Sequence, residues 1–274
     1  MDSFICSYSR TNRRGPIGAC IPLLTVDLTD KYSTDEKWSS DKLISIDTNR
    51  DSDIALTITM MPRTEKDSQI IEKAKSLQGV CWGEEYEKMI SGILYSPLAS
   101  ELIEGRTRAR FLMSEFNGPP KPDVPFSETV AQREVTLRKL FGRVGRGVYI
   151  EPPLFVDYGC NISVGDGFYA NFNLTVLDCG LVTIGNNVEI GPNVNIITGE
   201  HETKIEARRK HRGTEFTREV IIGDDCWIGA NVTILAGVTI GSGCSIGAGS
   251  VVKRDIPPYS IAVGSPARVI RSAV

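Results

Sequence analysis

The sequence has no long run of apolar residues, and no stretch approaches the ~20 residues that a membrane-spanning helix needs. Its first residues, MDSFICSYSRTNRRGP, lack the charged-then-apolar order of a secretory signal. The seven cysteines include no CxxC pair, and scattered thiols in odd number are typical of reduced, intracellular proteins. We therefore expect a cytoplasmic protein with no membrane partner.

The sequence also has no large excess of positive or negative charge, and it contains few histidines. The 31 basic and 34 acidic residues give a net charge of −3, which leaves no basic face for a nucleic acid. The two histidines are His201 and His211. A metal enzyme of the carbonic-anhydrase kind needs three histidine ligands, so this class is excluded by count and we expect no metal.

The first third of the chain carries the weakest pattern. Residues 1–82 are rich in Asp, Ser, Thr and Lys, which predicts an N-terminal extension that is partly disordered. Within it, residues 54–61 alternate as a strand does, although no partner is obvious nearby.

Residues 83–143 follow a helical pattern. Apolar residues spaced by three and four predict a helix from about residue 84, with one face formed by Tyr86, Met89, Ile90, Ile93 and Leu94. After Pro97 we expect a second helix over 98–116 and then a third over 127–141, with Ser127 as its N-cap. This region is predicted to be a small helical subdomain.

From residue 144 the apolar period becomes six. Large aliphatic residues recur without interruption at Ile222, Ile228, Ile234, Ile240, Ile246 and Val252. The same register appears at Ile184, Ile190 and Ile196, and a weaker version begins at Val144. A coincidence within an ordinary β-sandwich cannot sustain six consecutive matches.

A period of six is three times the strand period of two. Short strands joined by tight Gly, Asn or Asp turns explain it, and three of them close one coil of about 18 residues. Stacked coils then bury each other's aliphatic residues. The pattern predicts a mainly β protein with a parallel β-helix over 144–271, although the period does not decide its handedness.

The repeat is interrupted once, between Ile196 and Val220. The intervening residues are polar and cannot fill a coil, so we expect a protruding loop over 198–220. Long loops on a rigid scaffold are where function is often found, and this one contains both histidines.

Several segments in order are similar to the maltose/galactoside O-acetyltransferase family of hexapeptide acyltransferases. They are GRTRARFLMSEFN (105–117), IEPPLFVDYGCNISVG (150–165), FYANFNLTVLD (168–178), ITGEH (197–201), IGDDCWIGANVTI (222–234), IGAGSVVKRDIPP (246–258) and VGSPARVIR (263–271). The resemblance covers about 84–271. It implies a left-handed β-helix, a homotrimer with sites between neighbours, acetyl-CoA as co-substrate and a sugar hydroxyl as acceptor.

The resemblance also assigns the base. Transfer of acetyl to a hydroxyl needs a group that takes the hydroxyl proton, and histidine suits this task. The family's histidine motif matches Thr198-Gly199-Glu200-His201, so His201 is the candidate catalytic base. His211 is expected to be a surface residue.

Acceptor-binding residues are implied in the same way. They are Asn171, Asp178, Asp157 and Arg106, and such side chains suit the paired donors and acceptors of a sugar. The alternatives stay open: Asn171 and Asp178 could merely form turns, and Asp157 and Arg106 could form surface ion pairs.

The co-substrate is expected along the last coils. Small residues, Ala230 and Ala248, would let the pantetheine arm approach, and cations would meet the phosphates of CoA: Lys253, Arg254, Arg268 and Arg271. Taken one at a time, each of these charged side chains could equally be a solvated surface residue that binds no ligand.

Three departures from the family pattern are present, and the first two bear on the substrate. Pro97 stands where an acidic residue is frequent, Glu202 where Pro is frequent, and Lys253 where Thr is common. Two other functions therefore remain: an acetyltransferase for an amine or xenobiotic acceptor, and a non-catalytic scaffold. The second would lack the base or the cations.

Overall fold

The structure is a computed structural model that describes residues 42–48 and 54–274. The extension predicted for residues before 42 lies outside the described residues. Strands β1 (Lys42–Thr48) and β2 (Ile54–Met60) pair antiparallel, with Lys42 opposite Met60. The strand predicted at 54–61 thus has a partner, which lies immediately before it in the chain.

Helix α1 (Ser68–Lys75) lies within the range that the sequence assigned to the extension. The side chain of Asp67 caps it, accepting hydrogen bonds from the backbone N–H groups of Gln69 and Ile70. Ile70 and Ala74 are buried, so the helix packs against the body of the protein through one apolar face.

The helices α2 (Glu84–Ser91), α3 (Ser100–Phe116) and α4 (Phe126–Leu140) form the predicted helical segment. Gly92 ends α2 in the left-handed conformation, with φ 78°, so Ile93 and Leu94 follow the helix. The N-cap prediction for Ser127 was wrong, because the cap position of α4 is Pro125 and Ser127 lies inside the first turn.

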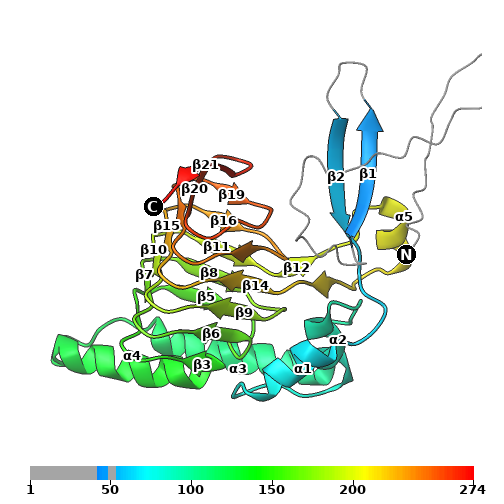
Figure 1. Cartoon of the computed structure of the whole chain (residues 1–274). Helices are drawn as coiled ribbons and strands as arrows, with labels where there is room; N and C mark the ends of the chain where they lie inside the picture. Colours follow the sequence, from blue (N-terminus) through cyan, green and yellow to red (C-terminus); the bar gives the residue numbers. More distant parts are fainter. Residues whose placement is uncertain (1–41, 49–53) are drawn as a thin grey trace, which may run out of the picture. The chain divides into compact units, whose positions relative to one another are not determined.

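All but two of the remaining described strands form three mainly parallel sheets, which are the three faces of a solenoid (Figure 1). Face 1 contains β4 (Tyr149–Ile150), β7 (Tyr169–Ala170), β10 (Glu189–Ile190), β15 (Trp227–Ile228), β18 (Ser245–Ile246) and β20 (Ser260–Val263), with β21 (Arg268–Ser272) antiparallel at its edge. Face 2 contains β5 (Leu154–Val156), β8 (Leu174–Leu177), β11 (Asn195–Ile197), β16 (Thr233–Ile234) and β19 (Val251–Val252). Face 3 contains β3 (Arg143–Val144), β6 (Ile162–Val164), β9 (Val182–Ile184), β14 (Val220–Ile222) and β17 (Thr239–Ile240). The predicted left-handed β-helix is confirmed as the fold class.

The aliphatic residues that carry the six-residue period fill the solenoid. Ile228, Ile234, Ile240 and Ile246 each have 0% exposed surface, as predicted. Residues one position away point outward, since neighbours on a strand face opposite sides. The helices α3 and α4 close the first end of this core, where Leu112 and Leu137 join the same apolar cluster.

Coil length changes along the solenoid. In the early coils Arg143 pairs with Ser163, whereas later Ile221 pairs with Thr239, so partners on adjacent early coils lie two positions further apart in the chain. The additional residues lie at the corner between faces 2 and 3. Inward-facing Val156 and Ile162 are six positions apart across that corner, while Ile234 and Val238 are four apart. The predicted coil length thus fits the later coils, and the early ones are wider.

The interruption of the repeat also leaves at this corner. It contains β12 (Gly199–Glu200), α5 (Ile205–Lys210) and β13 (Phe216–Thr217), and β12 pairs antiparallel with β13. Figure 1 shows this segment projecting from the coils. In the described part of the chain, no helix is long and apolar enough to span a membrane.

Candidate active site

Five of the predicted site residues lie along one corner of the solenoid, where face 2 turns into face 3. Asp157 follows β5, Asp178 follows β8, the protruding segment with His201 follows β11, and Lys253 and Arg254 follow β19. We call this column of turns the site corner. The early coils have two additional residues in these turns, and two of the polar residues of the site corner, Asp157 and Asp178, lie there.

Asp178 is fully buried at the site corner. Its Oδ1 accepts hydrogen bonds from the backbone N–H groups of Asp157 and Tyr158, each at 2.9 Å, while Oδ2 has no partner. Burial raises the pKa of this carboxyl well above its ordinary value. The buried side chain therefore fixes the backbone that carries Asp157.

Asp157 itself is partly exposed. Its Oδ2 accepts a hydrogen bond from the Cys179 thiol, with 3.4 Å between the heavy atoms. Burial, and then the charge of Asp157, raise the pKa of that thiol, so Cys179 remains a neutral donor. Tyr95 also lies close to Cys179, with its hydroxyl buried.

Arg106 extends from α3 toward the same turn. Its guanidinium donates to the Tyr158 hydroxyl at 2.6 Å and also to the Pro97 carbonyl, and it lies 5.6 Å from the Tyr158 ring centroid. Arg106 thereby joins the helical segment to the wide turn that contains Asp157. Pro97, one of the departures from the family pattern, contributes a carbonyl acceptor here.

His201 is exposed and directly follows β12. Its Nδ1 lies 3.3 Å from the Thr214 carbonyl oxygen. A carbonyl only accepts, so this contact requires the proton on Nδ1 and leaves the Nε2 lone pair free. A histidine with a free, exposed Nε2 is chemically able to act as a base.

The base of the protruding segment is rigidly held. The buried Thr198 hydroxyl donates to the Leu177 carbonyl at 2.6 Å and accepts from the Gly180 N–H at 2.7 Å. Arg218, at the other end, donates to the carbonyls of Gly92 and Met61. His201 therefore stands on a fixed stem.

Two glutamates flank the candidate base in the chain. Burial raises the pKa of Glu200, against the opposing charges of His201 and Arg218. Glu202 instead holds His211, with 2.6 Å between Oε2 and Nδ1. The departure at Glu202 thus gives His211 a partner within the loop, in keeping with its predicted lack of a catalytic role.

Asn171 does not reach His201 within one chain. It follows β7, so it lies at the corner between faces 1 and 2, and the whole of β8 separates it from Asp178. Its side chain accepts from the Phe172 N–H at 2.7 Å and donates to the Tyr169 hydroxyl at 3.2 Å. Ala230 and Ala248 lie in successive turns of that same corner.

The predicted phosphate-binding cations are at the end of the solenoid. Lys253 and Arg254 lie on the turn after β19, while Arg268 and Arg271 belong to β21, and all four are exposed. None of them pairs with an acidic side chain within the described residues, so their charges are available to an anionic ligand.

The chain matches two family models: the bacterial transferase hexapeptide (six repeats) over residues 219–254, and the maltose acetyltransferase hexapeptide capping motif over residues 88–145. It is 42% identical to a galactoside O-acetyltransferase of Escherichia coli (strain K12) over 185 residues, which cover 68% of this chain and 87% of that protein. The chain belongs to the maltose/galactoside O-acetyltransferase family.

Solved structures agree with this assignment. A maltose O-acetyltransferase from Clostridium difficile 630 superposes with a TM-score of 0.65 at 41% identity, covering 69% of this chain and 97% of that one. A galactoside acetyltransferase in complex with coenzyme A gives 0.64 at 40% identity, covering 70% and 92%. The family resemblance is confirmed, and the chain is an acyltransferase.

Sequence reasoning missed Tyr95, Tyr158 and Cys179 in this site. Tyr158 and Cys179 each follow a predicted site aspartate directly, so this adjacency was the available signal. Tyr95 had no such signal, because its place depends on the pairing of Tyr95 with Glu215 in the protruding segment.

Proposed function

We propose that this chain transfers the acetyl group of acetyl-CoA to a hydroxyl of a sugar or glycoside, with His201 as the general base. The observation that carries the proposal is the His201 geometry, with Nδ1 engaged by the Thr214 carbonyl and Nε2 free on a fixed stem. The relatives named for sugar O-acetylation support the acceptor class.

In the proposed step, His201 Nε2 takes the proton of the acceptor hydroxyl while its oxygen attacks the thioester carbonyl. The tetrahedral intermediate then expels the CoA thiolate as the new ester forms, and the thiolate takes up the proton that His201 holds. No other group changes its protonation over the cycle. Backbone N–H donors would stabilise the intermediate's oxyanion.

Asp157 and Arg106 would contact acceptor hydroxyls, because both lie partly exposed at the site corner. Asp178 has no exposed surface. We therefore propose that Asp178 is a positioning residue that acts through the Asp157 backbone, with no direct contact to the acceptor.

The donor side fits a CoA molecule. The unpaired cations Lys253, Arg254, Arg268 and Arg271 supply the charge that its phosphates need. Ala230 and Ala248 leave a column of small side chains beside the solenoid, along which the pantetheine arm can lie.

A complete site would require two copies of the chain. Asn171 and His201 lie at opposite edges of face 2, so a site containing both forms where one copy's corner meets the other corner of its neighbour. Repetition of such a head-to-tail contact closes a ring, and we propose the homotrimer typical of the family.

The decisive experiment follows CoA thiol release over a panel of sugars, glycosides and amines. We expect turnover with sugar hydroxyls and a loss of 10²–10⁴-fold in kcat for His201→Ala, the usual worth of a general base. His211→Ala is the matched control and should retain kcat, since His211 pairs with Glu202.

Other outcomes separate the alternatives. Turnover confined to amines would favour the amine or xenobiotic acceptor. No turnover with any acceptor would favour the scaffold, and equal rates for wild type and His201→Ala would disprove the assigned base.

A further inference from the structure

A small pocket lies on face 3, beneath helix α1, and its lining residue Asn161 donates a hydrogen bond to the Asp178 carbonyl at 2.6 Å. Its volume is about 110 Å³, and its lining residues are Lys73, Ser76, Leu77, Arg143, Asn161, Ser163, Leu181 and Thr183. A buried water needs roughly 10–15 Å³, so the pocket has room for a group the size of a tetrahedral oxyanion.

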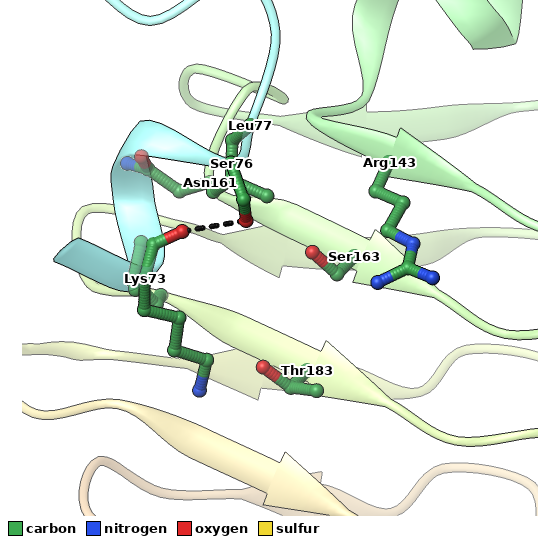
Figure 2. A pocket seen from close by; sticks show the side chains of 8 residues that line it. Lys73, Ser76, Leu77, Arg143, Asn161, Ser163 and Thr183 are labelled. Carbon is green, nitrogen blue, oxygen red and sulfur yellow. Dashed lines mark hydrogen bonds between the residues drawn. The ribbon is translucent and has the colours of Figure 1, made fainter. Parts of the chain in front are cut away.

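The floor of the pocket is a column of outward-facing polar residues. Arg143 on β3 pairs with Ser163 on β6, and Ser163 pairs with Thr183 on β9. Parallel neighbours are spaced about 4.8 Å apart, so a guanidinium and two hydroxyls stand in one row. Figure 2 shows this row facing the same gap as Lys73.

These floor groups form no side-chain hydrogen bond or ion pair with a described residue, although the pKa of the Asp166 carboxyl, which is lowered first by hydrogen bonds from Arg146, is also lowered by the charge of Arg143. Arg143 forms no ion pair within the described chain, and the hydroxyls of Ser163 and Thr183 form no hydrogen bond with a described residue. Arginine offers several N–H donors in a planar fork that suits phosphate, and hydroxyls can add further donors.

Helix α1 completes the pocket from above. Lys73 forms an ion pair of 2.8 Å with Glu219, and the Ser76 hydroxyl donates to the Lys73 carbonyl. The helix is anchored over face 3 because the Gln78 N–H donates to the Gly142 carbonyl at 3.1 Å, directly before Arg143. Glu219 neutralises the charge of Lys73. The net positive charge of the pocket lining therefore comes from Arg143.

The roof of this pocket is not part of the matched family segments. The capping motif begins at residue 88, whereas α1 ends at Lys75. The pocket forms where α1 lies over face 3, outside the segment that the capping motif matches.

We propose that the pocket beneath α1 is a binding site for a small oxyanion of the phosphate class, held by Arg143, Ser163 and Thr183. This site is separate from the proposed CoA contacts, which lie at residues 253–271. Arg143 is exposed, so solvent weakens its attraction and the affinity should be modest.

The test measures the thermal unfolding midpoint against inorganic phosphate, at fixed ionic strength and with saturating CoA to occupy the other cationic site. A ligand that binds the native state raises the midpoint in a saturable way. We expect such a rise for wild type, with Arg143→Gln weakening the apparent affinity about tenfold, the effect of one charge-assisted hydrogen bond. Arg110→Gln is the matched control, because Arg110 is exposed on α3 and does not line the pocket, and it should bind as wild type does.

A rise that fails to saturate, or an unchanged affinity in Arg143→Gln, would overturn the site. Should Arg143→Gln not fold, Ser163→Ala decides in its place, with Thr239→Ala on the same face as its control. Hydrogen exchange shows where phosphate binds. Phosphate should protect the backbone amides of residues 68–78, and protection confined to residues 253–271 would contradict the proposal.

Discussion

Asp178 shows how burial changes the meaning of a site residue. A carboxyl with two backbone donors on Oδ1 and none on Oδ2 is satisfied best when Oδ2 carries a proton. Burial raises its pKa, so the native state holds a proton that the unfolded chain releases above its ordinary value of 3.8. Raising the pH therefore favours the unfolded state.

We predict that Asp178→Asn removes this dependence. Relative to the variant, the wild type should lose about 1.4 kcal/mol of unfolding free energy per pH unit above about pH 4, until the native carboxyl ionises. Urea unfolding at several pH values and fixed protein concentration measures the difference.

Asp166→Asn is the control of opposite sign. The Arg146 backbone N–H and guanidinium lower the pKa of Asp166, so its contribution is lost as the pH falls. A pH-independent difference between wild type and Asp178→Asn would contradict the proposed protonation.

Thr198 supports a second prediction at the residue scale. Its buried hydroxyl joins two backbone groups, so Thr198→Val leaves the Leu177 carbonyl and the Gly180 N–H without this partner. We expect a loss of about 1–3 kcal/mol in unfolding free energy and a lower kcat, because the stem that carries His201 loosens. Thr198→Ser keeps the hydroxyl, so this variant should retain most of the unfolding free energy and most of kcat. Urea unfolding and rate measurements check the two quantities.

At the residue scale the sequence indicated which residue types line the site corner, but it could not indicate how deeply each side chain is buried. Whether Asp178 or Asp157 points inward depends on the two additional residues of the wide coils. The six-residue period carries no information on such corners, since the inserted residues do not disturb the aliphatic positions on either side.

At the scale of elements, the helices and inward-facing strands were predictable because their apolar residues repeat with the period of the structure. Helix α1 was not, since its eight residues bury only Ile70 and Ala74 and no longer pattern is present. Its place is decided by contacts with α2 and face 3, which are distant in sequence.

We predict that α1 is an integral part of the fold. Ile70→Ala should lower the free energy of unfolding by about 2–3 kcal/mol, near the lower end for buried aliphatic truncations because Ile70 keeps 8% exposure. Gln69→Ala, at the adjacent exposed position, should change it little. If Ile70→Ala and Gln69→Ala both changed the free energy of chemical unfolding by the same small amount, α1 would add nothing to the stability of the rest of the protein.

At the scale of the whole molecule, the repeat determines one solenoid, and the proposed site needs residues from two of its corners. Asn171 and His201 lie across face 2 from each other. A sequence alignment by motif places both in one site, but only the folded chain shows that they occupy different edges.

Mixed assemblies test this arrangement. His201→Ala and Asn171→Ala are each expected to be nearly inactive alone, whereas chains unfolded together and refolded at equal amounts should recover about a quarter of wild-type activity by random pairing in a ring. Each single variant carried through the same refolding is the control. Absence of recovery, with assembly confirmed by sedimentation, would contradict a site shared between two chains.

The change in coil length also divides the solenoid by its tolerance to redesign. The later, shorter coils contain only what stacking requires, so one could be duplicated or deleted as a unit with the register of the others intact. The longer early coils cannot be exchanged in this way, because their surplus residues form the wide turns of the site corner. An engineer who wished to lengthen this protein would therefore insert new coils after β14, where the wide turns of the earlier coils are left unchanged.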